Sequence, residues 1–554
     1  MTMNSAKLPA FRASRSAIIR AIDHTYYLTA LTRSGMMRPA RPARVARAAS
    51  AIRRYGMLGG IAGVAAARFP DRVALIDELG TLSFADLDSR SNAIANAWRR
   101  GGLRPGEGVG VLVRNHRGFL DAVFAAAKCG ARVVLLNTDF TPPQLRQVLH
   151  REQIDLLVHD DEHTLRLDGP LPPRGRWRAW ADTPGADTLE ALIVAGDTSP
   201  APPPGRPPRI ILLTSGTTGM PKGAARPEPR SLAPIGAVLD RVPFRAGETT
   251  TLCPPMFHTL GFAHMMLAVT LGSTLVVRRR FDPHTVLDDL RRQHSSALIV
   301  VPIMLARVVD ALERCETPTA LPDLRIVYAA GSQLGADLAA RARNTLGPVL
   351  YNMYGSTEVA YATIATPDDL ASQPGCVGKP VRGVEIRILD DGGQPVAASR
   401  TGRIFVGNPY QTQGYTGGGH KDIVDGLMSS GDIGHFSAGR LFIDGRADDM
   451  IVSGGENVFP GEVEELLNAH PAIREAACIA VPDDRYGQRI RAFVAASEPG
   501  ALTAEQIRDH VKHNLARYKV PRDIVFVAEL PRTATGKIVK TALPTDPTLE
   551  STPH

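Results

Sequence analysis

The chain has few cysteines, no long apolar run and a shortage of acidic residues at its start. Its five cysteines are scattered and show no paired spacing: Cys129, Cys253, Cys315, Cys376 and Cys478. This pattern argues against a cysteine-rich zinc motif or a disulfide framework, and it is typical of a cytoplasmic protein. No apolar run reaches the roughly 18 residues that a membrane-spanning helix requires, so the chain is not expected to cross a bilayer.

The shortage of acids is confined to the first fifty residues, in which Asp23 is the one acidic residue. The same stretch carries nine basic residues: Lys7, Arg12, Arg15, Arg20, Arg33, Arg38, Arg41, Arg44 and Arg47. Its net charge of +8 equals that of the whole chain, so the remainder is close to neutral. A neutral body does not indicate a protein that binds nucleic acid.

Residues 1–58 are therefore predicted to form a basic N-terminal extension. It does not resemble a secretory signal, because charged residues interrupt its apolar patches. One interpretation is an amphipathic segment that makes peripheral contact with anionic membrane lipid. Its apolar side would consist of Ile18, Ile19, Ile22, Tyr26, Tyr27 and Leu28. The other interpretation is a disordered or partner-docked leader.

The order of patterns along the chain predicts several domains, since 554 residues exceed one compact core. Between Gly60 and Glu162 helical and strand patterns alternate without hairpin turns, which predicts a largely parallel sheet. Short strands with glycine turns follow between Gly383 and Ile443. The predicted fold class is α/β, with three parts: a large N-terminal domain of α/β sheets plus a small β subdomain (59–447), a small α+β C-terminal domain (448–545) and a tail (546–554).

One stretch organises the candidate chemistry: a buried strand, Ile210–Leu213, runs into a loop of hydroxyls, glycines and one lysine. The residues predicted to contact phosphate are Thr214, Ser215, Gly216, Thr217, Thr218, Gly219 and Lys222. Glycines let backbone N–H groups approach an anion, hydroxyls add donors, and the lysine adds charge. It is not a Walker loop, because its glycine spacing differs and Gly223 replaces the magnesium-holding Ser or Thr. A flexible surface loop is the alternative.

Several later residues carry chemistry but also have an ordinary structural explanation. Tyr354 suits stacking on a base and Glu358 suits a hard cation, yet the same polar segment is compatible with a plain turn. Asp432 suits ribose hydroxyls, although Gly-Asp pairs are common in turns. Alone, His258 is more typical of a packed core residue, and Lys537 of a solvated charge.

Six segments in this order resemble the adenylate-forming superfamily of acyl-CoA synthetases, peptide-synthetase adenylation domains and luciferases. They are Thr214 to Gly223, Tyr354 to Glu358, Ser430 to Asp432, Gly445-Arg446 with Asp448, Ser453 to Asn457, and Pro531 to Lys537. The likeness covers residues 60–543. It implies that a small-molecule carboxylic acid attacks the α-phosphate of ATP, with Mg²⁺ present, and that coenzyme A then takes the acyl group.

The resemblance also implies roles for individual residues in the first step. Lys537 would lie between the substrate carboxylate and the α-phosphate, and Glu358 would ligate magnesium. The loop from Thr214 to Lys222 would hold the β- and γ-phosphates. The adenine and ribose would be bound by Gly331, Ser332, Asn352, Tyr354, Gly355, Thr357, Asp432 and Arg446.

For the second step, the resemblance implies that a mobile C-terminal domain rotates about Asp448. This rotation would withdraw Lys537 and bring in the coenzyme A tunnel formed by Ser453, Gly454 and Gly455. His258 resembles the residue that clears or lines that route. Luciferases carry a lysine at the position of Gly454, so oxidation is not expected. The Ser453 to Asn457 segment favours a stand-alone coenzyme A ligase, and loading of a carrier protein is the alternative.

The acyl pocket is predicted at the apolar run from Leu260 to Met266, with Gly261, Phe262 and Met265 as lining residues. This run is pliable and offers no cation for a second carboxylate. The first expectation is therefore a medium- or long-chain fatty acid, as in a fatty-acid–CoA ligase. An aryl acid such as a benzoate or coumarate is the alternative. No oligomeric state is predicted.

Overall fold

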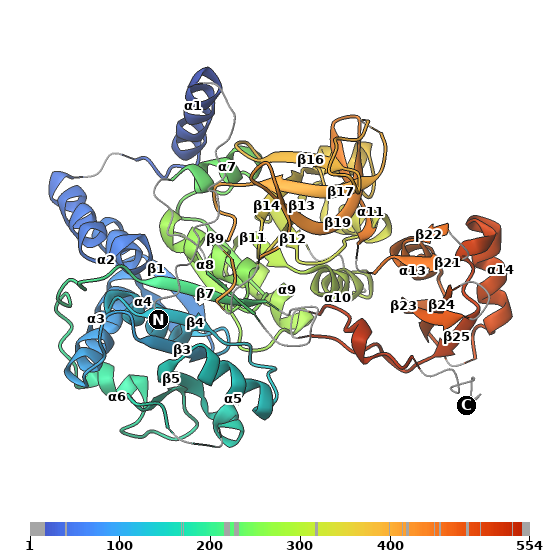
Figure 1. Cartoon of the computed structure of the whole chain (residues 1–554). Coiled ribbons are helices and arrows are strands. Elements are labelled where there is room, and N and C mark those ends of the chain that lie inside the picture. The colour runs from blue at the N-terminus through green and yellow to red at the C-terminus, as the bar shows by residue number, and fades with distance from the viewer. Residues whose placement is uncertain are drawn as a thin grey trace.

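The structure is a computed structural model. It describes residues 17–38, 41–167, 169, 171–214, 222–225, 232–315, 320–397, 399–412, 414–416, 420–447, 449–453, 456–483, 487–498, 500–533 and 536–545. Figure 1 shows the whole chain, with a large N-terminal part and a small C-terminal part at one side. The large part contains two extended sheets, and the α/β class predicted from the sequence is confirmed.

The first sheet has six strands, and all neighbours in it are parallel except the last pair. Its order is β6 (Arg176–Trp180), β5 (Ile154–Asp160), β3 (Gly108–Leu112), β4 (Arg132–Leu135), β7 (Arg209–Thr214) and β8 (Lys222–Ala225). Strand β3 is buried along its whole length, as expected of a central parallel strand with an apolar sequence. The predicted phosphate loop joins the antiparallel pair β7 and β8 at the edge of this sheet.

The second sheet has nine strands, with a parallel centre and antiparallel edges. Its order is β15 (Lys379–Pro380), β14 (Ala360–Ala365), β13 (Leu350–Ser356), β12 (Ile326–Ala330), β11 (Ser295–Val300), β9 (Thr249–Leu252), β10 (Thr274–Val277), β1 (Val73–Asp77) and β2 (Gly80–Ser83). The segment that carries Asn352 and Tyr354 is therefore a strand, paired in parallel with β12, and not a turn.

Helices pack between and around the two sheets. They are α2 (Pro42–Arg68), α3 (Phe84–Arg100), α4 (Arg117–Lys128), α5 (Pro142–Arg151), α6 (Leu189–Val194), α7 (Ala233–Arg241), α8 (Thr259–Leu271), α9 (Pro283–Arg292), α10 (Pro302–Glu313), α11 (Ala336–Leu346) and α12 (Pro367–Ser372). The largest core cluster includes residues of both sheets together with α2, α3, α4 and α8. Helix α3 begins where Ser83 and Asp86 form a capping box, which satisfies its first N–H groups.

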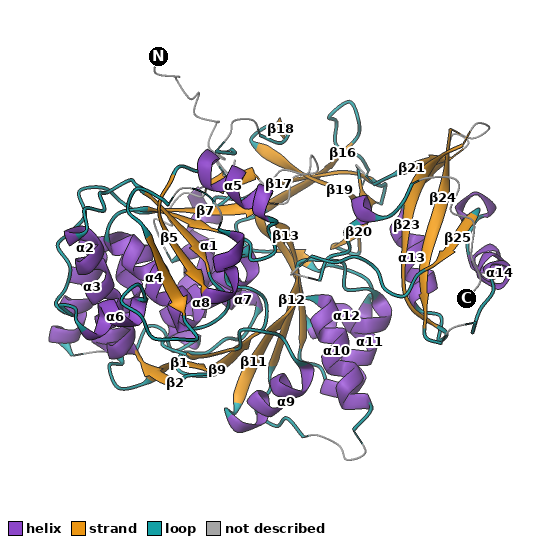
Figure 2. Cartoon of the chain, turned by 90° about the horizontal axis from the view of Figure 1, so that it is seen from below, coloured by secondary structure: helices purple, strands orange, loops and turns teal. Residues whose placement is uncertain are grey.

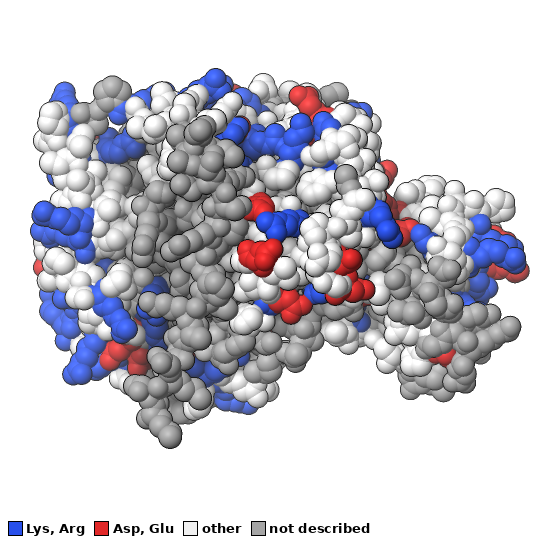
Figure 3. Space-filling model, turned by 45° about the horizontal axis from the view of Figure 1, so that its top comes forward, with Lys and Arg blue, Asp and Glu red and all other residues white. Residues whose placement is uncertain are grey.

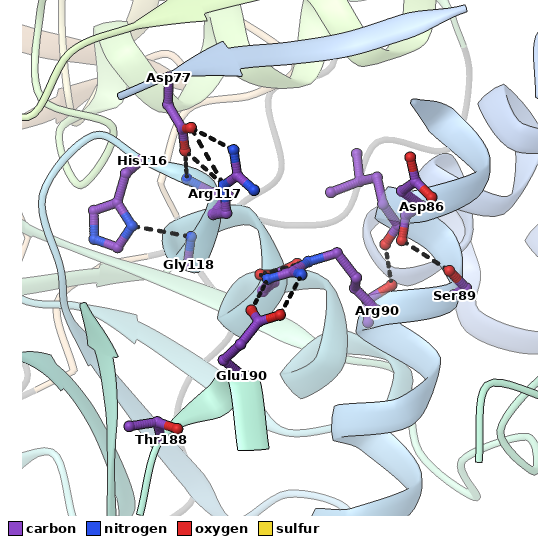
Figure 4. A network of polar contacts seen from close by, with 12 residues as sticks. Asp77, Asp86, Ser89, Arg90, His116, Arg117, Gly118, Thr188 and Glu190 are labelled. Atoms are coloured by element: carbon purple, nitrogen blue, oxygen red, sulfur yellow. Dashed lines mark hydrogen bonds and ion pairs between the residues drawn. The ribbon is translucent and has the colours of Figure 1, made fainter. Parts of the chain in front are cut away.

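Ion pairs join helices α3, α4 and α6 to one another and to β1 of the second sheet (Figure 4). Arg117, at the start of α4, donates to the carboxylate of Asp77 at the end of β1, with a shortest distance of 2.6 Å. Arg90 of α3 bridges Asp121 of α4 and Glu190 of α6, at 2.8 and 2.9 Å. Asp121 is fully buried, so its charge depends on this guanidinium partner.

The small β subdomain and the C-terminal domain complete the chain. The subdomain sheet contains β16 (Glu385–Leu389), β17 (Gly402–Gly407), β19 (Leu427–Ser437), β18 (Ile423–Val424) and β20 (Arg440–Arg446), all antiparallel. The C-terminal sheet contains β22 (Glu456–Val458), β21 (Ile451–Ser453), β24 (Gly487–Ala496), β23 (Ile473–Asp483) and β25 (Asp523–Phe526), with α13 (Pro460–Asn468) and α14 (Ala504–Asn514). Figure 2 shows this C-terminal unit at one side of the molecule.

The described part of the N-terminal extension is folded against the large domain. Helix α1 (Ala17–Arg33) packs on α7, and its inner face is buried at Tyr27, Ala30 and Leu31. The interpretation of a disordered leader is therefore wrong for this part, because burial of these side chains offsets the entropy of ordering. Tyr27 also does not belong to an exposed apolar side. No helix of the described residues is long and apolar enough to span a membrane.

Candidate active site

The two ends of the predicted phosphate loop are held together by strand pairing. Thr214 lies opposite Lys222, and Leu213 lies opposite Gly223. A Cβ at Gly223 would lie 2.5 Å from the Thr416 Oγ1, so any larger residue would displace the Thr416 side chain. Residues Ser215, Gly216, Thr217, Thr218 and Gly219 lie outside the described residues, as do the side chains of Thr214 and Lys222. The pairing of β7 with β8 therefore fixes the positions at which the loop begins and ends.

Glu358 lies beside the return of this loop. Its two carboxylate oxygens accept hydrogen bonds from the Tyr415 hydroxyl and the Ser356 hydroxyl, each at 3.0 Å. Tyr415 in turn forms a β-bridge with Ala224 in β8. Burial and the neighbouring Glu358 carboxylate raise the pKa of Tyr415, so its hydroxyl stays a donor. An oriented carboxylate near a phosphate loop is a donor group that fits Mg²⁺.

A second group of predicted residues meets where β13 faces the β subdomain. The Tyr354 hydroxyl donates to the Asp432 carboxylate at 2.5 Å, and Arg446 Nη1 donates to the same carboxylate at 3.4 Å. Burial and the Asp432 carboxylate raise the pKa of Tyr354 well above its usual value. Burial also raises the pKa of Asp432, against the opposing effects of the Tyr354 hydroxyl and the Arg446 charge. These residues form a partly buried polar unit that can receive hydroxyl groups.

The other residues predicted for adenine and ribose lie on the same sheet. Asn352 is buried in β13, and the Thr357 Oγ1 lies 3.3 Å from the Thr259 Oγ1 of α8. Gly355 packs closely on the Ala360 carbonyl across the hairpin to β14. Gly331 and Ser332 form an exposed turn directly after β12, and Gly331 has a φ of +102° that favours glycine. Apart from Gly331 and Ser332, these residues lie in β13 or directly after it.

His258 precedes α8 and is a neutral histidine. Burial lowers its pKa to about 4, and its ring lies 4.5 Å from that of Phe257. Among the described residues its Nε2 atom has no hydrogen-bond partner. Burying a ring nitrogen without a hydrogen-bond partner costs free energy and is uncommon in folded proteins. The position is therefore one at which a ligand or a water molecule can bind.

The residues predicted to line the acyl pocket differ in how far they are buried. Phe262 is half-buried in the first turn of α8, whereas Gly261 is buried against the Pro255 carbonyl. Met265 has an exposed fraction of 0% and belongs to the main core. Its role in an acyl pocket stays a prediction.

Lys537 is exposed, in a turn of the C-terminal domain. The Lys537 N–H donates to the Thr533 Oγ1 at 3.2 Å, and the Gly536 N–H donates to the Thr533 carbonyl at 2.7 Å. Gly536 has a φ of +74°, and a Cβ there would lie 2.1 Å from the Cγ2 of Ile303 in α10. Val301, just before α10, is the neighbour of Gly331. The lysine turn and the turn after β12 therefore both contact the start of α10.

The remaining predicted residues belong to the domain junction. Asp448, Gly454 and Gly455 lie outside the described residues. Ser453 pairs with Glu456 and Gly487 in the C-terminal sheet, but its side chain is not described. The two domains touch where Glu465 of α13 accepts a hydrogen bond from the N–H of Ala336 at 3.2 Å.

Sequence reasoning missed three residues of this site: Tyr415, Ser356 and Ile303. Tyr415 is 57 positions away from Glu358, and only the folding of the β subdomain brings the two side chains together. Ser356 stands next to predicted residues, and its hydroxyl is the available signal. Ile303 has an ordinary apolar sequence context that gives no sign of its contact with Gly536.

Comparison with known proteins agrees with this geometry. The family model described as AMP-binding enzyme matches residues 64–416, and that of the AMP-binding enzyme C-terminal domain matches residues 462–537. A feruloyl-CoA synthase from an Amycolatopsis species is 30% identical over 485 residues, covering 86% of this chain and 96% of that protein. An indoleacetate–CoA ligase from Aromatoleum aromaticum is 30% identical over 497 residues, covering 86% and 93%.

A solved structure shows the same fold. The o-succinylbenzoate CoA synthetase from Bacillus subtilis, in complex with its acyl-adenylate intermediate, matches with a TM-score of 0.75 and 26% identity. The match covers 87% of this chain and 97% of that chain. The chain therefore belongs to the AMP-binding, or adenylate-forming, enzyme family, and it is a carboxylic acid–CoA ligase that uses ATP, Mg²⁺ and coenzyme A.

Proposed function

We propose that this ligase activates an aromatic carboxylic acid. The observation that carries the proposal is that the three proteins above act, by their names, on the aromatic acids ferulate, indoleacetate and o-succinylbenzoate. An aryl acid thus replaces the fatty acid that the sequence suggested first.

In the first half-reaction, a carboxylate oxygen of the acid attacks the α-phosphorus of ATP. The new carboxyl–phosphorus bond forms as the bond to pyrophosphate breaks, which leaves an acyl-adenylate. Asp432 and Tyr354 bind the ribose side, and Arg446 adds a charge there, as their shared hydrogen bonds support. Mg²⁺, when held by Glu358, offsets phosphate charge.

Lys537 supplies positive charge where negative charge gathers in the transition state. A preorganised donor of this kind contributes about 3 to 4 kcal/mol to catalysis. The exposure of Lys537 and the contact of Gly536 with Ile303 support a turn that reaches the site from outside the large domain.

In the second half-reaction, the coenzyme A sulfur attacks the acyl carbonyl and AMP leaves. The sulfur loses its proton, the carbon–sulfur bond forms, and the carboxyl–phosphate bond breaks. The neutral ring of His258 lines the route of the thiol, and the segment from Ser453 to Gly455 forms the tunnel. Asp448 is the hinge between the two arrangements. The burial that keeps His258 uncharged supports this role, because it leaves a ring without net charge beside the acyl group.

The experiment is a substrate panel in an assay of coenzyme A-dependent AMP release. Ferulate, indole-3-acetate, benzoate and anthranilate are compared with octanoate and decanoate at equal concentrations. We expect kcat/KM for at least one aryl acid to exceed that of both fatty acids by about tenfold or more, as for a pocket that discriminates by one or two good contacts.

A higher kcat/KM for a fatty acid would contradict the aryl assignment while leaving the ligase reaction intact. AMP release with a phosphopantetheinyl carrier protein, but not with free coenzyme A, would move the acceptor to the carrier protein.

A further inference from the structure

The N-terminal segment outside the matched family region has an inner face that fixes its orientation. Tyr27 of α1 fits between two glycines, because a Cβ at Gly236 would lie 2.8 Å from its Cβ and one at Gly383 2.6 Å from its hydroxyl. The Tyr27 hydroxyl donates to the Arg382 carbonyl at 3.1 Å. The Arg382 guanidinium joins Asp23 of α1 to Asp240 of α7. The opposite side of α1 therefore points away from the domain.

The first arm of α2 is fixed to the same body. Gly56 has a φ of +70° and a ψ of −171°, which breaks the helix into two arms that fold back on each other. The Arg44 Nη1 donates to the Arg68 carbonyl at 3.2 Å, and the Arg68 Nη2 donates to the Met36 carbonyl at 2.5 Å. These bonds join the linker after α1 to both arms of α2.

The outward side of this segment exposes apolar side chains. Five of the eleven large apolar residues that are exposed in the described chain lie between positions 22 and 45. The Tyr26 ring is partly covered by the Arg382 guanidinium at 3.6 Å, and the other four are Ile22 (47%), Leu28 (54%), Met37 (53%) and Val45 (54%). The hydroxyls of Thr29 and Thr32 donate back to helix carbonyls at 2.8 Å, which makes this side less polar than its sequence suggests.

The same segment is basic and, after Asp23, free of acids. No Asp or Glu occurs between positions 24 and 70. Exposed arginines in the described part of this stretch are Arg33, Arg38, Arg41, Arg47, Arg53 and Arg54. No ion pair joins any of them to an acid among the residues that the structure describes. In Figure 1 both α1 and α2 stand out at the periphery, and Figure 3 turns the top of the molecule, where α1 lies, toward the viewer.

We propose that the outward side of residues 22–54 docks on an anionic lipid surface. Arginines suit lipid phosphates, and the interspersed aliphatic and aromatic side chains suit the boundary between headgroups and acyl chains. A nucleic acid would match the charge but would leave Ile22, Leu28 and Met37 in water, so lipid fits the surface better. This docking is independent of the acid that the active site accepts.

The test is co-sedimentation of the full chain with phosphatidylcholine vesicles, with and without a quarter of phosphatidylglycerol. Binding is expected only with the anionic lipid and is expected to weaken with added salt. The variant Arg41→Gln/Arg47→Gln should lose about fivefold in vesicle affinity for each arginine removed. The control Arg291→Gln/Arg292→Gln removes the same charge from exposed positions on α9 and should bind as the unaltered chain does.

A second pair of variants tests the apolar part of the surface. Ile22→Ser/Leu28→Ser should weaken vesicle binding by about tenfold, because partial burial of two aliphatic side chains in lipid is lost. Leu165→Ser/Leu171→Ser alters two exposed leucines elsewhere and is the matched control. AMP release by all four variants should equal that of the unaltered chain. Equal AMP release would show that the variants are folded.

Three results would overturn the proposal. The first is no binding to anionic vesicles, and the second is equal binding by each variant and its control. The third is tight binding to duplex DNA or RNA that depends on Arg41 and Arg47 while Ile22→Ser/Leu28→Ser has no effect on either ligand.

Discussion

Two parts of the active site differ in how they are held. Tyr354 and Asp432 are partly buried, bonded to each other, and carried by strands of two sheets within the large domain. Lys537 is exposed, and its turn touches the large domain through Gly536 and Ile303. The proposed nucleotide side is thus built into the fold, whereas the proposed catalytic lysine lies on a separate domain. This difference suits an enzyme whose two half-reactions need the lysine in turn present and withdrawn.

The largest expected effect comes from removing the positive charge of Lys537. Lys537→Ala should lower acid-dependent pyrophosphate exchange by about 10²- to 10³-fold, because a transition-state donor is lost. Thioester formation from supplied acyl-adenylate should persist, since the nucleotide side is intact. Normal exchange in this variant would sink the role of Lys537.

The next effect concerns the proposed rotation of the C-terminal domain between the adenylation and the thioester-forming arrangements. Asp448→Pro fixes φ at the predicted hinge, so it should spare pyrophosphate exchange and lower thioester formation by about 10²-fold or more, comparable to other losses of catalytic geometry. Asp448→Ala is the control, because it removes the carboxylate and keeps backbone freedom. Equal loss of both half-reactions in the proline variant would count against a hinge at this position.

The proposed ribose contact of Asp432 is tested by Asp432→Asn. A carboxylate that accepts charge-assisted hydrogen bonds contributes about 1.5 to 3 kcal/mol for each, so KM for ATP should rise by about 10- to 100-fold. Asp422→Asn, at an exposed ion pair in the same subdomain, is the control and should leave KM unchanged. If both variants gave the same KM, the ribose assignment of Asp432 would fail.

A smaller effect is expected at the contact between the lysine turn and the large domain. Gly536→Ala places a Cβ against Ile303 and in a left-handed backbone, which costs about 1 to 2 kcal/mol, so pyrophosphate exchange should fall by about tenfold. Ile303→Ala in the same chain should restore part of the rate. Thioester formation from supplied acyl-adenylate is the internal control, and an equal drop there would show general damage instead.

The smallest effect is expected at Tyr415, which donates a hydrogen bond to the proposed magnesium ligand Glu358. Tyr415→Phe removes one hydrogen bond to Glu358, which contributes about 1 kcal/mol, so the Mg²⁺ concentration for half-maximal rate should rise by about fivefold. An unchanged Mg²⁺ requirement with a lowered maximal rate would mean that Tyr415 does not orient this carboxylate.

The sequence predicted the elements whose patterns are local. The buried strand expected over Ile210–Leu213 is found as Arg209–Thr214, and the short strands expected between Gly383 and Ile443 are found as β16 to β20. Both have strong periodicity or a continuous apolar run, which need no partner to be recognised. The strand Leu350–Ser356 was not recognised, because its polar residues are accommodated by pairing with β12 and β14.

The same reason explains what was missed in the site. Tyr354, Asp432 and Arg446 belong to recognisable motifs, but their mutual hydrogen bonds depend on where the β subdomain packs. The orphan ring nitrogen of His258 and the full burial of Met265 depend on which side of α8 faces the core. Composition indicated a basic N-terminal segment, while the glycines that receive Tyr27 lie more than two hundred residues further along the chain.

A single competition experiment tests the proposed function most directly. The unaltered enzyme is given equal amounts of ferulate and decanoate with ATP, Mg²⁺ and coenzyme A, and the coenzyme A thioesters are identified by mass spectrometry. The expected product is the aryl thioester in excess of decanoyl-CoA. An excess of decanoyl-CoA would contradict the aryl assignment, and acyl-adenylate without either thioester would contradict coenzyme A as the acceptor.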